Sequence, residues 1–244
     1  MQTKRLFPLF IALLAFAACK KDPLTRPVKF TSTTYETLAP YDSVGRPSNL
    51  LPRDTISPSL QSYIGSILVE QSDLRKTHPE LLSTSAIADI ALTQSSDVFI
   101  TFVSQITGST NALGFYTYPT TTPPTDPKDI QKITYAFPNI GDGTKLKAGD
   151  KIKIGHFESG TSIGFVVLKS AWNATTRSLN NDVVHFCSND ILNPEVDPSL
   201  KKHAVLINYP AENKVLIGFE NTDRTSPKCD HDFNDVVIYA TIAH

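Results

Sequence analysis

The sequence has almost no net charge, no internal repeat and none of the familiar catalytic motifs. Its 23 Lys and Arg residues nearly balance 24 Asp and Glu residues. The resulting net charge of -1 provides no overall attraction to nucleic acid or to an anionic membrane surface. No segment recurs at a fixed period, which argues against a propeller or a solenoid. GxSxG, HExxH, SxxK and phosphate-cradling glycine loops are all missing, so we expect no enzymatic activity.

The apolar run at residues 6–18, LFPLFIALLAFAA, is too short to span a membrane comfortably. It follows the basic stretch MQTKR and leads through Ala17 and Ala18 into Cys19. This order resembles a bacterial lipoprotein signal. The resemblance implies removal of residues 1–18 and a lipid anchor on Cys19, which would tether the protein to the outer membrane, on its cell-surface or periplasmic face. An ordinary secretory signal or an uncleaved anchor helix is the alternative.

Cysteine is scarce, and only Cys187 and Cys229 remain once Cys19 is assigned to lipid. Two cysteines in an oxidising compartment could form a disulfide, or one could be a buried thiol and the other an exposed one. Spacing alone cannot decide between these alternatives, because a disulfide requires the two Cα atoms to lie within bridging distance.

Residues 19–52 lack hydrophobic periodicity, and we interpret them as a tether and irregular lead-in to a single domain at residues 53–244. Ser57 and Pro58 form a helix start, with Ser as the N-cap and Pro at the first helical position. An apolar stripe at helical spacing follows, and the helix should end before His78-Pro79. We expect this amphipathic helix to pack through its apolar stripe and to cap one end or cover an edge of the domain.

The remainder of the sequence has the pattern of short strands joined by turns. Lys151 to Ile154 alternates polar and apolar residues, as a half-buried strand does. Further strand candidates are rich in β-branched and aromatic residues; they lie at residues 97–103, 114–118, 162–168, 203–208, 215–220 and 236–242. The pattern predicts a mostly β protein, an antiparallel, jelly-roll-like β-sandwich with one N-terminal helix.

The region from residue 90 to residue 244 contains LKAGD at 146–150, GTSIGF at 160–165, IGFE at 217–220 and Asp232-Phe233-Asn234-Asp235. These segments are similar to the LruC-type domain of bacterial surface and secreted proteins, also called domain of unknown function 4114, and the last of them is the most specific. The resemblance implies the fold but no established activity. This chain departs from the family pattern at Asn221, where an acidic residue is usual, so one negative charge is lost.

Acidic residues are concentrated just before the last predicted strand. Asp230, Asp232 and Asn234 alternate as in the first half of an EF-hand, but Asp235 and Thr241 occupy the positions that require Gly and Glu. If the last two strands pair, the cluster also approaches Glu220. The sequence therefore predicts a structural calcium site at Glu220, Asp230, Asp232, Asn234 and Asp235. Asx turns that only terminate the loop are the alternative.

Other candidate ligands and contacts are less specific. Cys229 and His231 lack a zinc-ligand spacing and any orienting third group. Alternate residues of an extended chain point to opposite sides, so we expect His231 to point away from the aspartates or to be solvent-exposed. Tyr116, Tyr118 and Trp172 could stack on sugar rings at an edge of the sandwich, or they could be core residues.

These observations favour a lipid-anchored cell-envelope module with a structural or adhesive role. Its partner would be a glycan, a matrix protein or another envelope protein, and nucleic acid is not expected. The alternative is a glycan-binding module of a polysaccharide-uptake system, and a hydrolase is a distant third.

Overall fold

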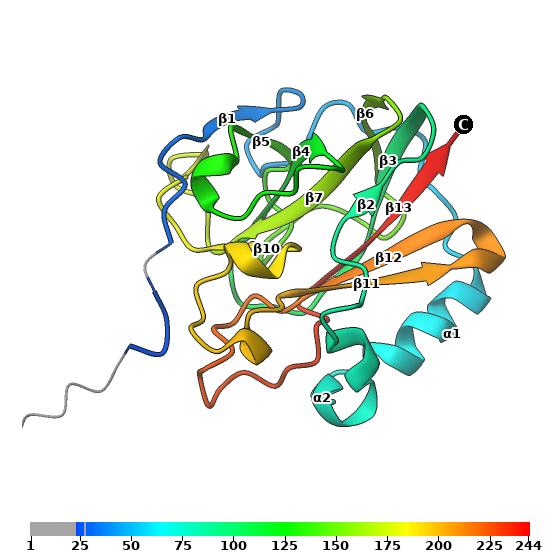
Figure 1. Cartoon of the computed structure of the whole chain (residues 1–244). Helices are drawn as coiled ribbons and strands as arrows, with labels where there is room; N and C mark the ends of the chain where they lie inside the picture. Colours follow the sequence, from blue (N-terminus) through cyan, green and yellow to red (C-terminus); the bar gives the residue numbers. More distant parts are fainter. Residues whose placement is uncertain (1–22, 27) are drawn as a thin grey trace, which may run out of the picture.

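Two β-sheets pack face to face in the computed structural model, which describes residues 23–26 and 28–244 (Figure 1). Cys19 and the signal segment lie outside these residues. The first sheet has the order β1-β5-β4-β7-β10, and β2 also pairs with β7. Its strands are β1 (Thr34–Thr37), β2 (Ile90–Ala91), β4 (Ala112–Pro119), β5 (Lys132–Phe137), β7 (Thr161–Leu168) and β10 (His185–Cys187).

The second sheet has the order β11-β12-β13-β3-β6. Its strands are β3 (Ser96–Gln105), β6 (Lys151–Phe157), β11 (Ala204–Tyr209), β12 (Lys214–Phe219) and β13 (Val236–Ala243). A small hairpin of β8 (Trp172–Asn173) and β9 (Ser178–Leu179) stands apart. Neighbouring strands in the five-stranded sheet are antiparallel, so the prediction of a mostly antiparallel β-sandwich is confirmed.

The main core lies between the sheets, where Ile100 of β3, Phe165 of β7 and Ile238 of β13 belong to one buried cluster. β7 and β13 are buried along most of their length because their outer faces are covered as well. This explains why both strands contain near-continuous apolar runs and not the alternation seen in β6.

Helix α1 (Pro58–Ile67) begins as predicted, because the Ser57 side chain accepts a hydrogen bond from the Leu60 amide at 3.1 Å. It packs on the outer face of the five-stranded sheet, where Leu60 and Ile64 join Leu216 and Tyr239 in a second buried cluster (Figure 1). The expectation that the helix caps an end or covers an edge was wrong, because the outer face of this sheet is apolar and has to be covered.

The helix also ends earlier than predicted. The chain turns after Ile67, and Gln71 adopts a positive φ of 59°. The one-turn helix α2 (Leu74–Thr77) and the 3-10 helix η1 (Pro79–Leu82) follow. Four more 3-10 turns lie in loops, at η2 (Pro127–Asp129), η3 (Asp190–Leu192), η4 (Pro198–Leu200) and η5 (Pro210–Glu212). Among the described residues, no helix has the length and apolar character needed to cross a membrane.

Part of the expected lead-in is built into the sandwich. Residues 34–37 form β1, which pairs in parallel with β5 at the edge of the six-stranded sheet. Further along, the Leu51 amide donates to the Lys151 carbonyl at 2.8 Å, and Arg53 pairs with the buried Asp150 at 3.0 Å. The lead-in has little sequence periodicity because it runs along the edges of strands and contributes few core residues.

Gly218 in β12 allows a close contact between this strand and the loop that follows it. A Cβ at this position would lie 2.4 Å from the backbone oxygen of Phe233 and 2.8 Å from Leu68 Cδ1. We expect Gly218→Ala to destabilise the protein by about 1–3 kcal/mol, because a backbone oxygen cannot move aside as a flexible side chain can. Thermal and urea unfolding would measure the change.

Gly65 provides the matched control for this substitution. It lies in α1, and an added Cβ there would meet no atom within 4 Å. Gly65→Ala should therefore stabilise the protein by roughly 0.5–1 kcal/mol, since alanine loses less backbone entropy in a helix. Equal effects of the two substitutions would contradict this account of Gly218.

Candidate metal centre

The predicted acidic residues lie where β12 and β13 leave the five-stranded sheet. Phe219 is opposite Val236, so Glu220 and Asp235 follow and precede the last paired residues of the two strands. The Asn221 amide donates to Asp235 Oδ2 at 2.7 Å, and the Thr222 amide donates to Glu220 Oε1 at 3.0 Å. The antiparallel pairing therefore brings the two carboxyl groups together, as the sequence suggested.

Glu220 is only 1% exposed, and its second carboxyl oxygen, Oε2, has no hydrogen-bond partner. Burial, followed by the nearby carboxylate of Asp235, raises the pKa of Glu220 to about 9. Burial also raises the pKa of Asp235. Two carboxylates this close in a desolvated site cannot both remain charged unless a cation neutralises them. Without a cation, one of them takes up a proton.

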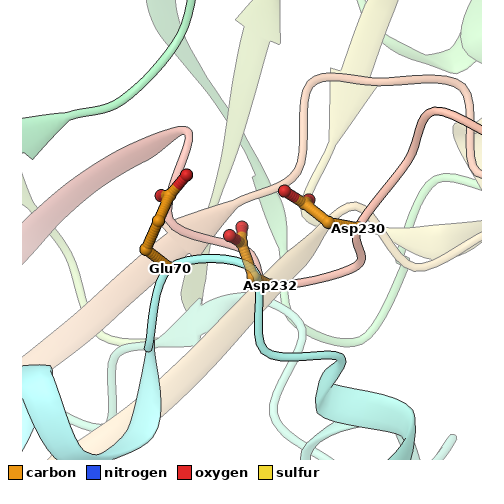
Figure 2. A group of neighbouring side chains, drawn as sticks. All are labelled: Glu70, Asp230 and Asp232. Atoms are coloured by element: carbon orange, nitrogen blue, oxygen red, sulfur yellow. The ribbon is translucent and has the colours of Figure 1, made fainter.

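Asp230 and Asp232 meet a third carboxylate, Glu70, in the turn after α1 (Figure 2). One oxygen from each of the three side chains lies within 4.8 Å of the others. Glu70 and Asp230 are exposed, whereas Asp232 is buried at the base of the group. Asp232 also fixes the turn, because its Oδ2 accepts a hydrogen bond from the Gln71 amide at 2.8 Å.

The structure thus divides the five predicted ligands and adds a sixth residue. Asp230 and Asp232 belong with Glu70, whereas Glu220 and Asp235 form a separate pair at the ends of β12 and β13. Glu70 was missed because nothing in the local sequence marks it and only folding brings the helix turn to this loop. Asn234 is buried, and its side-chain nitrogen has no partner.

The two acidic groups interact electrostatically through Asp230. The negative charge of Asp230 contributes to the raised pKa of Glu220, Asp235 and Asp232. The pKa of Asp232 rises to about 6, with burial as the first cause and two backbone amides opposing it. The donors are carboxylate oxygens, which suit a hard cation such as Ca²⁺, and the Glu220 oxygen without a hydrogen-bond partner offers a further lone pair nearby. The residues present therefore fit calcium.

A buried histidine holds the backbone of Glu220 in place. His203 Nδ1 lies 2.7 Å from the Glu220 carbonyl oxygen, which can only accept, so this nitrogen carries a hydrogen. His203 Nε2 lies 2.8 Å from Glu195 Oε1, and both side chains are fully buried. The Glu220 amide in turn donates to the His203 carbonyl at 2.9 Å. The end of β12 is therefore clamped on both sides of Glu220.

A second buried network contains His231 and corrects the expectation that this histidine is solvent-exposed. His231 is 4% exposed, and its Nδ1 accepts a hydrogen bond from Arg224 Nε at 3.2 Å. The loop reverses here, because His231 and Phe233 both have positive φ, so the alternation expected of an extended chain does not apply. Burial, with Arg224 and Arg75, lowers the pKa of His231 to about 4.

Cys229 lies beside this network, with Sγ 3.3 Å from His231 Nδ1. Burial, followed by the charge of Glu220, raises the pKa of the thiol. A protonated thiol beside a neutral imidazole is the opposite of the thiolate–imidazolium pair of a cysteine nucleophile.

The candidate disulfide is not formed, since Cys187 and Cys229 are both free thiols. Cys187 is packed in the buried cluster on the outer face of the six-stranded sheet, whereas Cys229 lies in the loop before β13. One residue lies in a strand of the six-stranded sheet and the other in a loop of the five-stranded sheet, which explains the absence of a bond between them.

The predicted aromatic row for glycan stacking is also not formed. Tyr116 and Trp172 are 2% and 3% exposed, as the alternative of core residues requires. Tyr118 is half-buried, and its hydroxyl donates to Asp89 at 2.6 Å. Trp172 packs edge-on against Tyr41 of the lead-in, with ring centroids 5.6 Å apart.

A comparison with known protein families finds a match to part of the chain. Residues 157–243 match the family described as Domain of unknown function (DUF4114). The matched region contains β7 through β13, with Glu220, the acidic loop and the His203 clamp, but it does not include Glu70. No curated protein and no solved structure matches the chain.

The raised pKa of Glu220 predicts a specific pH dependence of stability when divalent cations are absent. With a pKa of about 9 in the folded protein and an ordinary value of 4.5 when unfolded, Glu220 retains a proton that unfolding releases. Stability should therefore fall as pH rises from about 7 to about 8.5, by at most roughly 1.4 kcal/mol per pH unit for one proton. Asp89 and Asp232, with pKa values of about 6, titrate below this range.

Thermal melts in EGTA across this pH range would test the prediction. Glu220→Gln should remove most of the pH slope, because glutamine keeps the shape of the side chain and cannot ionise. A wild-type midpoint independent of pH, or an unchanged slope in Glu220→Gln, would show that Glu220 does not hold the proton.

Proposed function

We propose that this protein is a lipid-anchored module of the bacterial cell envelope with a structural or adhesive role. Its acidic corner, which comprises Glu70, Glu220, Asp230, Asp232 and Asp235, would bind calcium. The observation that carries the calcium proposal is the convergence of Glu70, Asp230 and Asp232 beside a buried Glu220 with an unpartnered carboxyl oxygen. The convergence joins two segments that are far apart in the sequence. A cation at this point would bind both.

Calcium would stabilise the fold by binding the folded state alone. Glu70 belongs to the turn after α1, and Asp230 and Asp232 belong to the loop between β12 and β13. Neutralising these carboxylates removes their mutual repulsion and fixes the helix turn to the loop. The gain follows mass action and reaches about 2.7 kcal/mol when free calcium is 100 times the dissociation constant.

The structural or adhesive role is supported by the architecture and by the expected anchor. A sandwich with a main core and two further buried clusters is a rigid unit, suited to presenting a surface to a glycan, a matrix protein or another envelope protein. The lipoprotein-like segment ending at Cys19 would hold this unit at the outer membrane.

The calcium proposal predicts that removing the Glu70 charge weakens the response to calcium. Wild-type protein should melt at a higher temperature in calcium than in EGTA, and Glu70→Gln should lose most of this difference. Glu70 is exposed, so its replacement leaves the core unchanged. Differential scanning calorimetry and isothermal titration with CaCl₂ would measure both effects.

Glu158→Gln is the matched control, because Glu158 is an exposed glutamate in a different loop. It should retain the full calcium response. A wild-type melting temperature that is the same in calcium and in EGTA would contradict the proposal, as would equal losses in the two variants.

If the proposed lipid anchor exists, Cys19 carries the lipid. The wild-type protein, expressed in a bacterial host with labelled fatty acid, should incorporate the label and partition into detergent, and Cys19→Ser should do neither. Label that persists in Cys19→Ser would place the modification elsewhere. Protease treatment of intact cells would then distinguish the cell-surface from the periplasmic face.

A further inference from the structure

A cleft of about 990 Å³ opens at one edge of the sandwich. Strands β1, β5 and β4 of the six-stranded sheet line one side, and Ile154 and Phe157 of β6 line the other. The loop at residues 119–125 forms a wall. The cleft shares no lining residue with the acidic corner. Its volume is at the upper end of the range of small-molecule sites.

The cleft exists because the two sheets do not end together. The five-stranded sheet ends at β6, whereas the six-stranded sheet continues through β5 to β1. Glu36, Thr134 and Phe115 are in register across these last three strands. Phe115 is part of the core between the sheets, so Thr134 and Glu36 extend the same face outward past the core. Polar side chains thus replace apolar ones where the five-stranded sheet no longer covers this face of the six-stranded sheet.

The floor of the cleft is aromatic and partly accessible. Phe115 and Phe157 meet edge to face, with ring centroids 6.3 Å apart, and Phe157 is only partly buried. Tyr118 also lines the cleft, but its ring packs with the cluster on the outer face of the six-stranded sheet, so the floor consists of Phe115 and Phe157. Aromatic rings offer a flat apolar surface to a ligand that also carries polar groups.

The charged groups in the cleft are already paired. Glu36 accepts hydrogen bonds from Lys132 Nζ at 2.9 Å and from Thr134 Oγ1 at 3.1 Å. Asp129 Oδ2 accepts from the backbone amides of Thr125 and Asp126, each at 3.0 Å. Neither an anionic nor a cationic ligand would therefore find an uncompensated partner here. Hydrogen-bonding groups remain at the rim, including the exposed side chains of Thr117 and Gln131.

The wall of the cleft is held in place before any ligand binds. Pro123 and Pro124 restrict its backbone, and the Pro124 carbonyl accepts a hydrogen bond from Asn189 Nδ2 at 3.0 Å. The hydrogen bonds from the Thr125 and Asp126 amides to Asp129 fix the following turn. A wall with this many constraints loses little conformational entropy on binding, which favours affinity for a ligand that makes few strong contacts.

We propose that this cleft is a binding site for a neutral oligosaccharide. The aromatic floor would pack against the C–H face of a sugar ring, and the threonine, glutamine and paired charged side chains at the rim would bond its hydroxyl groups. Tyr116 and Tyr118 line this cleft, but Trp172 does not, so the site differs from the aromatic row that the sequence suggested. The site is independent of calcium binding at the acidic corner.

An array of neutral oligosaccharides built from hexoses, pentoses and N-acetylhexosamines would identify a ligand, with sulfated and uronic-acid oligosaccharides and an extended-peptide library as comparison arms. Thr117→Trp fills the cleft from an exposed strand position and should weaken binding of the neutral ligand roughly tenfold or more. Thr37→Trp makes the same change on β1 outside the cleft lining and should bind as wild type does. The array would be run in calcium and in EGTA.

Chemical-shift changes in the wild-type protein provide a second readout that does not depend on either variant folding. They should concentrate in β1, β4, β5 and residues 119–125. The proposal is overturned if no neutral oligosaccharide binds, or if only acidic glycans or peptides bind. Equal loss in the two variants, or shift changes elsewhere on the protein, would overturn it as well. Binding that persists in EGTA supports a site separate from the acidic corner.

Discussion

A carboxyl group buried at the end of a central strand constrains the C-terminal half of this protein. Glu220 follows β12, is almost inaccessible to solvent and shares its surroundings with Asp235. Leaving such a group charged and unpaired in a desolvated site costs several kcal/mol. The backbone hydrogen bonds of Glu220 to His203 hold the group where it is, so the strand end cannot relax to expose it. A proton or a cation therefore has to compensate the charge.

The surroundings of Glu220 are built to tolerate this constraint. Glu195 and His203 form a buried polar pair on one side, and Arg224 reaches His231 on the other. Arg224 also lies over the ring of Phe233, 5.1 Å from its centroid, and Phe233 packs into the cluster beneath α1. The acidic loop is consequently part of the packing that attaches the helix to the sheet, and its charge state is linked to the stability of that attachment.

Structural and ligand-binding roles of the acidic residues are compatible with each other. Asp232 accepts hydrogen bonds from the amides of Gln71 and Asn234, as an Asx turn requires, and still lies within the carboxylate group that includes Glu70. A carboxylate has lone pairs for both tasks. The backbone bonds preorganise the oxygens, which lowers the conformational cost of binding a cation. The cleft beside β1 is constructed differently, because Lys132 pairs with its Glu36, two backbone amides donate to its Asp129, and its floor is aromatic.

Local patterns in the sequence were sufficient for the start of the helix, for most of the acidic corner and for seven strands, namely β3, β4, β6, β7, β11, β12 and β13. They did not identify β1, β5 or β10. The alternation in β6 and the Ser57-Pro58 cap are properties of a few consecutive residues, and the pairing of the last two strands follows from their proximity along the chain. The positions of Glu70 and His231 were different. Glu70 reaches the corner because α1 packs across the sheet, and His231 is buried because positive φ angles reverse the loop.

The sequence by itself therefore determined the class of fold and the chemical type of the corner, since hydrophobic periodicity and oxygen-rich composition are local. Only the tertiary structure decided which carboxylates lie close enough to interact electrostatically and that the two thiols do not form a disulfide. It also decided where the core is left uncovered, because these features depend on distances between segments that hydrophobic packing brings together.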